Sequence, residues 1–308
     1  MPDINRSINV TKRNIAGKDC DVVFFVSSSG HCSLDCHYCI VNPIVKHQPS
    51  LEISDFEYLL GAFPGKRAFL AFSGKGDFFA GYHKKDRLLE KLLDWDVEIG
   101  LDINGVMIHE LPELPEHKLA KIKSVNLTMH YEALAAKNAL KIWPGNAQIL
   151  IDLFHARGTE MLMGTIMSPT VEELWEEGLQ FYRDNVFEQT GKKIVLIRDV
   201  HRPFGEKSEM HLVELEKSYE SMIERVHQED FAKNFASYKN VLCPAGQQFF
   251  RIWNDGKVEA CPYIPQLRDA GNVKERIIHI REDLFRCNQA RYCDCNVIAR
   301  LGKMGYET

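Results

Sequence analysis

Three cysteines near the amino end of the chain are spaced closely enough to bind one metal centre. They are Cys32, Cys36 and Cys39, which form the pattern C-x3-C-x2-C within eight residues. Thiolates are soft ligands that bind iron-sulfur clusters or zinc. Three ligands from one short loop leave a fourth position open. In a four-iron cluster, the iron without a protein ligand can therefore bind a substrate or a cofactor.

A structural zinc site is the alternative interpretation of this segment. His31 or His37 would then supply the fourth ligand and close the site. Zinc sites usually combine one C-x2-C pair with a second close pair of ligands, and this segment has no such second pair. The spacing therefore favours a cluster with one open iron.

A second group of cysteines lies near the carboxyl end. Cys243 and Cys261 belong to the pattern C-x12-G-x4-C, which predicts a hairpin that brings the two thiols together on opposing strands. Cys287, Cys293 and Cys295 follow. Five thiols suffice for one four-thiolate site but not for two, and zinc is the alternative occupant. Cys20 belongs to neither group, and we expect it to be a buried, inert thiol.

These cysteines must be positioned by secondary structure, and the sequence predicts alternating strands and helices. Short apolar runs predict six strands, at 21–26, 68–72, 97–103, 124–130, 160–166 and 193–200. Helical patterns follow them, near 54–64, 84–94, 113–122, 145–157, 171–186 and 208–228. Ser54 and Glu57 form a predicted capping box at the first helix. The alternation predicts a parallel sheet covered by helices, either doubly wound or an incomplete barrel.

Composition excludes several classes of protein. The chain has 308 residues, of which 45% are hydrophobic, with only 12 Pro and 20 Gly, so it is not a disordered or low-complexity protein. The net charge of -5 gives no reason to expect nucleic acid as a partner. No apolar run approaches the roughly 18 to 20 residues of a membrane span, and the polar amino terminus has no signal-peptide core. We therefore expect a cytoplasmic protein without a membrane partner.

The first cysteine segment, CSLDCHYC after a predicted strand, resembles the signature of the radical S-adenosylmethionine superfamily. The resemblance implies that Cys32, Cys36 and Cys39 hold a 4Fe-4S cluster whose open iron binds the amino and carboxylate groups of S-adenosylmethionine. One electron then cleaves the cofactor to a 5'-deoxyadenosyl radical, which removes a hydrogen atom from the substrate. The resemblance also implies a partial (β/α)6 TIM-like barrel, and it implies that Tyr38 lies beside the adenine of the cofactor.

Downstream residues extend this resemblance. Ser73, Gly74, Gly76 and Asp77, after the second predicted strand, are similar to the family's glycine-rich motif, which approaches the methionine moiety. The segment departs from the family pattern in Lys75 and in having Asp77 where Glu is commoner. The family topology points further residues toward the cofactor, namely Asp102, Asn104, Thr128, His130 and Gly164. Each of these is equally suited to be a helix cap or a hydrogen-bonding loop residue.

Beyond the sixth predicted strand, four residues are candidates for contacts with a substrate: Arg198, Asp199, His201 and Arg202. Surface ion pairs are the alternative for at least two of them.

The carboxyl-terminal cysteine pattern resembles the SPASM and twitch extensions of the same superfamily, which hold auxiliary 4Fe-4S clusters. We expect an amino-terminal extension (1–20), a radical S-adenosylmethionine core (21–235) and a twitch-like module (236–308). The module is expected to bind one auxiliary cluster through Cys243, Cys261 and two of Cys287, Cys293 and Cys295. The C-x-C spacing of the last two departs from the usual C-x2-C and leaves the ligand set open.

The resemblance implies an oxidoreductase that uses a reducing electron donor such as flavodoxin or ferredoxin. The auxiliary cluster suggests net oxidation or bond formation on a small metabolite or a peptide. Peptide modifiers of this family often carry a leader-binding domain, for which the roughly 20 residues before the first strand leave no room. The alternatives are a peptide epimerase, which needs a thiol such as Cys20 to return a hydrogen atom, a methyltransferase, and a non-catalytic iron-sulfur or zinc protein.

Overall fold

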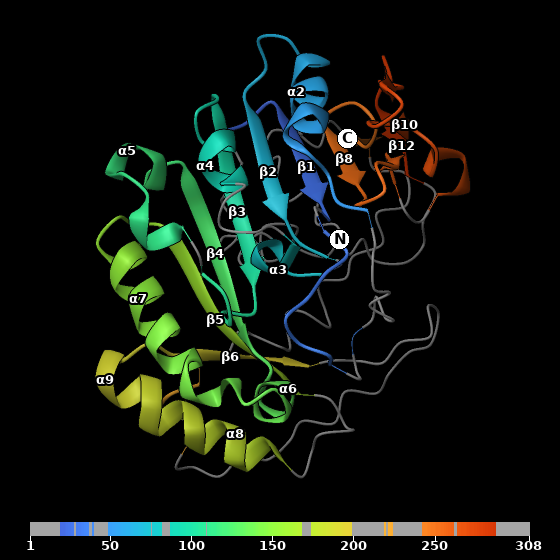
Figure 1. Cartoon of the computed structure of the whole chain (residues 1–308). Helices are drawn as coiled ribbons and strands as arrows, with labels where there is room; N and C mark the ends of the chain where they lie inside the picture. The colour runs from blue at the N-terminus through green and yellow to red at the C-terminus, as the bar shows by residue number, and fades with distance from the viewer. Residues whose placement is uncertain are drawn as a thin grey trace, which may run out of the picture.

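The computed structural model of the chain describes residues 19–27, 29–36, 39, 49–74, 76–81, 87–108, 110–167, 174–198, 219, 221–223, 242–261 and 264–287. Within these residues an eight-stranded sheet forms the centre, and helices flank it (Figure 1). No helix in the described ranges is both long and apolar enough to cross a membrane.

Six parallel strands follow one another across the sheet in chain order. They are β1 (Val22–Val26), β2 (Ala68–Phe72), β3 (Val97–Ile103), β4 (Ile122–Met129), β5 (Glu160–Met167) and β6 (Ile194–Arg198). A doubly wound sheet contains a point at which the strand order reverses, and this run of six contains none. Sequential parallel order is the order of a barrel wall. The expected partial (β/α)6 barrel is therefore confirmed, with strand bounds within two residues of the prediction.

The helices connect these strands. They are α2 (Ile53–Gly61), α3 (Phe78–Gly81), α4 (Leu88–Leu92), α5 (Glu116–Leu119), α6 (Tyr131–Ala136), α7 (Trp143–His155), α8 (Trp175–Tyr182) and α9 (Glu188–Thr190). A π-helical turn (Arg183–Phe187) joins the last two, and 3-10 turns lie at Leu111–Glu113, Ala139–Lys141 and Pro265–Leu267. Most of the predicted helix 208–228 lies outside the described residues.

Two details of the helix prediction are wrong. The capping box of α2 joins Glu52 to Asp55, because the main-chain N–H of Glu52 donates to Asp55 Oδ2 at 2.9 Å, so the predicted Ser54 cap lies inside the helix. The helices predicted at 84–94 and 113–122 are shorter than expected. Arg87 has a left-handed φ of 44° and Pro115 is extended, so each residue stops a helix from starting earlier.

The carboxyl-terminal segment joins the same sheet. The strand β8 (Phe249–Ile252) pairs in parallel with β1, and β9 (Val258–Glu259) pairs with β8 as the predicted hairpin. The blue β1 and the orange β8 lie side by side in Figure 1, although they are far apart in sequence. Two further strand pairs are short: β7 (Leu242–Cys243) with β12 (Phe285–Arg286), and β10 (Gly271–Asn272) with β11 (Ile277–Ile278).

The two faces of the barrel wall differ in chemistry. Successive side chains on a strand point to opposite faces, so Leu101 and Ile103 of β3 pack into the main core while Asp102 faces the other way. On that inner face, β1, β2 and β8 contribute a small apolar cluster that includes Phe69 and Phe249. The inner face is therefore apolar on one side and polar along β3 and β4.

Candidate functional site

The first cysteine group lies on the loop that follows β1 at its carboxyl end. Within the described residues none of Cys32, Cys36 and Cys39 forms a disulfide, and all three are partly exposed. The main-chain N–H of Cys39 donates to the carbonyl of Cys36 at 3.0 Å, so these two cysteines share one tight turn. The donor set of three thiols on one loop fits an iron-sulfur cluster.

The described part of the chain contains no group of three or more His, Cys, Asp or Glu side chains placed to hold a single metal ion. A structural zinc site needs four ligands around one ion. This absence applies to zinc and to a cluster alike, so it does not choose between the two occupants.

The glycine-rich loop after β2 packs directly on the cysteine loop. The main-chain N–H of Asp77 donates to the carbonyl of His31 at 2.7 Å. Gly76 has a φ of +82°, and an added Cβ would lie 2.4 Å from the carbonyl oxygens of Ser29 and His31. Because neither the conformation nor the space allows a side chain, glycine is required here. Gly74, with a φ of +100°, is exposed beside Ser73.

Asp77 ties this loop to the end of β3. Its side chain is buried, and its Oδ1 accepts the main-chain N–H of Phe79 at 3.0 Å. Its Oδ2 accepts the main-chain N–H of Asn104 at 2.8 Å. The structure thus shows a carboxylate that positions two loops, whereas the approach of this segment to the methionine moiety of the cofactor stays a prediction.

Asn104 is held at the centre of the site and contacts the cysteine loop. Its Nδ2 lies 3.4 Å from Cys32 Sγ and 3.0 Å from Ser33 Oγ. Its Oδ1 accepts the main-chain N–H of Val106 at 2.9 Å, and its main-chain oxygen accepts Nε1 of Trp143 at 2.7 Å. Burial raises the pKa of Cys32 to about 11, whereas the hydrogen bond from Asn104 acts in the opposite direction. Position after β3 predicts Asn104 as a site residue, but nothing in the sequence predicts its contact with Cys32.

The inner face beyond Asn104 carries further predicted residues. Asp102 lies opposite Asn126 in the β3–β4 register and accepts a hydrogen bond from its Nδ2. Thr128 is two residues further along β4, opposite Gly164 of β5. Asn126 was not predicted, although its position two residues before Thr128 places it on the same face.

His130 is the residue before α6, at the carboxyl end of β4. Desolvation by burial lowers the pKa of its imidazole to about 4, so the ring is neutral near pH 7. A neutral imidazole can donate one hydrogen bond and accept another.

Several predicted residues lie outside the described part of the chain: Tyr38, Lys75, Asp199, His201, Arg202, Cys293 and Cys295. Arg198 ends β6.

The second cysteine group is arranged differently from the prediction. Cys243 lies on β7, opposite Phe285 of β12, and not on the hairpin that precedes Cys261. The expectation that the two thiols lie on the opposing strands of this hairpin is therefore wrong. Cys287 is the residue directly after β12, two positions beyond the partner of Cys243.

Cys261 belongs to the same region. It follows β9, and both Cys261 and Cys287 pack against the main core. Gly246, three residues after Cys243, lies beside Ala260, the residue before Cys261. A Cβ added to Gly246 would be 3.0 Å from Cβ of Ala260. The fold thus brings three of the five carboxyl-terminal cysteines to one region.

Cys20 lies at the other end of the barrel. It precedes β1, its side chain is buried, and its Sγ lies 3.5 Å from Oε2 of Glu98. Burial, followed by the nearby carboxylate, raises the pKa of the thiol to about 12, which makes it unreactive. The whole length of β1, roughly 13–17 Å at about 3.3 Å per residue, separates it from the cysteine loop. The expectation of a buried thiol is confirmed.

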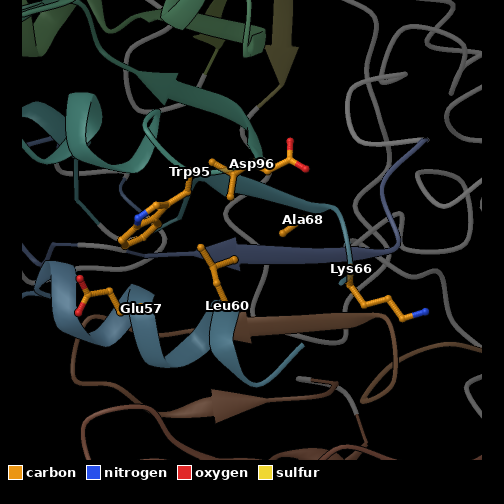
Figure 2. Close-up of a pocket in the computed structure, with 7 residues that line it drawn as sticks. Glu57, Leu60, Lys66, Ala68, Trp95 and Asp96 are labelled. Carbon is orange, nitrogen blue, oxygen red and sulfur yellow. The ribbon is translucent and has the colours of Figure 1, made fainter. Parts of the chain in front are cut away.

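A cavity of about 280 Å³ also lies at this far end (Figure 2). It is found where β2 and β3 begin, whereas ligands of parallel β/α sheets bind where strands end. It is therefore separate from the cysteine site. Its lining residues are Glu57, Leu60, Lys66, Ala68, Trp95, Asp96 and Val97.

No protein-family model and no curated protein sequence matches the chain. Its structure is similar to that of anSMEcpe with bound AdoMet, at 18% identity and a TM-score of 0.49, over 82% of this chain and 78% of that one. A complex of anSMEcpe with AdoMet and Cp18Cys peptide is similar at 18% identity and a TM-score of 0.48, over 82% and 77%. Streptococcus suis SuiB bound to S-adenosylmethionine is similar at 13% identity and a TM-score of 0.44, over 87% and 66%. Likenesses at this level do not bear on activity, which has to be inferred from this chain's own residues.

Proposed function

We propose that the protein is a radical S-adenosylmethionine enzyme. The observation that carries the proposal is the position of the C-x3-C-x2-C loop at the carboxyl end of β1, in a sequentially ordered parallel barrel wall. The glycine-rich loop of β2 packs on this loop, and an amide from the end of β3 reaches one of its sulfurs. Local spacing and barrel topology thus support a three-thiolate ligand set at the end of the barrel where such folds bind ligands.

The residues of the first group have separate roles in this proposal. Cys32, Cys36 and Cys39 hold a 4Fe-4S cluster through three of its irons. When bound, the cluster and S-adenosylmethionine supply a one-electron cleavage that yields a carbon radical able to remove hydrogen from an unactivated carbon. Asn104 donates a hydrogen bond to the Cys32 sulfur, and Asp77 holds Asn104 in place. Orienting the reactants in this way is the protein's contribution to such chemistry.

The inner face next to the cysteine loop supplies polar groups for orienting the cofactor or the substrate. Asp102 and Asn126 form a hydrogen-bonded pair there, and Thr128 follows on the same strand face. His130 adds a neutral hydrogen-bonding group at the end of β4. Ser73 and Gly74 provide backbone groups at the end of β2.

An auxiliary cluster on the second cysteine group would make the reaction a net oxidation or a bond formation. Cys243, Cys261 and Cys287 lie in one region, and Cys293 or Cys295 is proposed as the fourth ligand. These residues would hold a group that supplies an electron acceptor, and the substrate would be a small metabolite or a peptide. An epimerase that uses Cys20 as its hydrogen donor is disfavoured, because that thiol lies at the opposite end of β1.

The proposal is tested by anaerobic reconstitution with iron and sulfide, followed by reduction in the presence of S-adenosylmethionine. We expect 5'-deoxyadenosine as a product, measured by liquid chromatography, and its loss in Cys36→Ala. The matched control is Cys20→Ala, which should retain formation of 5'-deoxyadenosine because Cys20 belongs to neither cysteine group. Zinc in anaerobically purified protein, or S-adenosylhomocysteine as the only cofactor product, would contradict the proposal.

The iron content tests the auxiliary site separately. Two four-iron clusters give about eight irons per chain, and Cys243→Ala should lower the count to about four. A wild-type count of about four would remove the auxiliary cluster from the proposal and leave the first cluster intact.

A further inference from the structure

Three exposed apolar side chains lie on or beside α7. Among the described residues, six large hydrophobic side chains are exposed, and three of them are Met107, Ile142 and Ile149, at 38%, 51% and 42%. Ile142 is the residue before α7 and Ile149 lies seven positions later within the helix, so they lie on one helix face. Between them, Asn146 donates to the carbonyl of Val106 at 3.1 Å, next to Met107. The three side chains therefore share one surface.

This surface is basic as well as apolar. Lys137 and Lys141 are exposed on the connection from α6 to α7. Residues 133–151 contain these two lysines and no acidic residue, although the chain as a whole has a net charge of -5. The first acidic side chain along α7 is Asp152, which accepts a hydrogen bond from Gln148. We call Met107, Lys137, Lys141, Ile142 and Ile149 the α7 patch.

A chain of bonded contacts leads from the α7 patch to the cysteine loop. Exposed Ile142 is followed by Trp143, whose side chain is fully buried. Its Nε1 donates to the main-chain oxygen of Asn104 at 2.7 Å, and Asn104 Nδ2 lies 3.4 Å from Cys32 Sγ. Electron transfer slows steeply with distance and is faster through bonded contacts than through gaps. The α7 patch is thus a surface from which an electron can reach the proposed cluster.

We propose that the α7 patch is the docking surface of a small acidic electron-carrier protein. This inference rests on the proposed function, in which each cleavage of S-adenosylmethionine consumes one electron. The carrier, a flavin hydroquinone or a reduced iron-sulfur protein, loses that electron and the cluster gains it. Apolar side chains with charged neighbours are the usual make-up of protein interfaces, and electron-transfer encounters need only a small contact area. The two lysines attract an acidic partner and orient it.

The test compares two patch variants, Ile142→Glu and Lys141→Glu, with two matched controls. The first control, Ile277→Glu, changes an isoleucine that is 42% exposed and lies on β11. The strand β10 pairs with β11 and lies on the opposite side of the molecule from α7 (Figure 1). Lys193→Glu reverses the charge of an exposed lysine before β6. The probe is a bacterial flavodoxin, with a 2Fe-2S ferredoxin as the second carrier. Equilibrium binding is measured at low ionic strength by biolayer interferometry, without S-adenosylmethionine.

We expect each patch variant to weaken binding of the carrier about tenfold, which is the effect of losing one strong interface residue, and the controls to bind as the wild type does. Formation of 5'-deoxyadenosine driven by the reduced carrier should fall in the patch variants, whereas formation driven by dithionite should not change. A small reductant needs no docking surface, so this contrast separates docking from chemistry.

Different results would contradict the docking surface and the proposed function. Unchanged binding in both patch variants, or no binding of either carrier to the wild type, would overturn the docking surface. Absence of 5'-deoxyadenosine from the wild type with dithionite would overturn the proposed function, while the binding measurement would still decide the patch. If Ile142→Glu also loses the dithionite-driven reaction through its neighbour Trp143, Lys141→Glu decides alone.

Discussion

Asn104 links three parts of the site through its main chain and its side chain. Its main-chain oxygen accepts Nε1 of Trp143, its main-chain N–H donates to Asp77, and its side-chain amide donates to the Cys32 sulfur. Hydrogen bonds to ligating sulfurs stabilise the more negative, reduced state of an iron-sulfur cluster and raise its reduction potential. The amide is therefore expected to tune the proposed cluster as well as to shape the loop.

The substitution Asn104→Leu removes this hydrogen bond and should lower the reduction potential of the cluster. A hydrogen bond worth about 1 kcal/mol corresponds to about 40 mV for a one-electron couple. The potential is measured by redox titration monitored by electron paramagnetic resonance. The matched control is Asn126→Leu, which removes an inner-face amide bonded to Asp102 and should leave the potential unchanged. Equal shifts in the two variants would argue against a specific role for Asn104.

His130 makes folding stability depend on pH. Its pKa is about 4 in the folded protein and about 6.5 in an unfolded chain, so the unfolded state binds the proton more readily. The stability is fully present above pH 6.5 and is lost as the pH falls from about 6.5 toward 4, by about 2 to 3 kcal/mol. Urea denaturation at several pH values should show a smaller acid-side loss in His130→Gln. The exposed His155→Gln is the control, and an unchanged profile in His130→Gln would contradict the prediction.

At the scale of elements, the site depends on loops that touch where strands end. The loop after β2 reaches the cysteine loop through backbone contacts, and Gly76 allows the approach. The end of β3 is joined to both through Asp77 and Asn104, and α7 is joined to β3 through Trp143. The loop after β2 and the end of β3 thus contact the cysteine loop directly, and α7 contacts the end of β3.

Gly76→Ala should disturb this contact. The added Cβ would lie 2.4 Å from two main-chain oxygens, which cannot move aside as a flexible side chain would. Alanine is also disfavoured by the left-handed backbone conformation of this position. We therefore expect the free energy of unfolding, measured in urea, to fall by at least about 1 to 2 kcal/mol, and the iron content after reconstitution to be lower. Gly145→Ala is the control, because nothing lies within 4 Å of its Cβ and alanine favours the helix α7. Equal stability of the two variants would show that the loops relax freely.

At the scale of the whole molecule, the carboxyl-terminal segment completes the barrel wall. The strand β8 pairs with β1 and places Phe249 and Phe250, exposed by 1% and 0%, against it. Phe24 of β1 stacks on Phe250 with a ring separation of 6.0 Å. The edge of β1 is therefore covered by residues more than 200 positions later in the chain.

A chain truncated to residues 1–241 should not fold as a soluble monomer. It loses β8 and leaves β1 as an unpaired apolar edge strand, which favours aggregation. Size-exclusion chromatography and thermal unfolding measure the outcome. The control, truncation to 1–287, keeps every described strand and should remain monomeric, although it lacks the last two cysteines. A monomeric 1–241 with a cooperative thermal transition would show that the barrel folds without β8.

Much of this architecture follows from the sequence alone. The run 68–72 is predicted as a strand because burial on both faces makes it continuously apolar, and its bounds agree with the structure. The run 97–103 carries Glu98 and Asp102 among its apolar residues, and its predicted bounds also agree with the structure. The cysteine spacing is equally local, since a few residues of one loop hold all three thiols. Boundaries such as the cap of α2 were less predictable, because Glu52 and Ser54 are both plausible caps and only packing selects between them.

The order of the strands, and with it the choice of a barrel over a doubly wound sheet, was decided by tertiary structure. So were the contact of Asn104 with Cys32, the pairing of Cys243 with the strand before Cys287, and the position of β8 beside β1. Periodicity and spacing report on neighbours a few residues apart in the chain. These other features join residues separated by tens to hundreds of positions, which only the packing of the folded chain brings together.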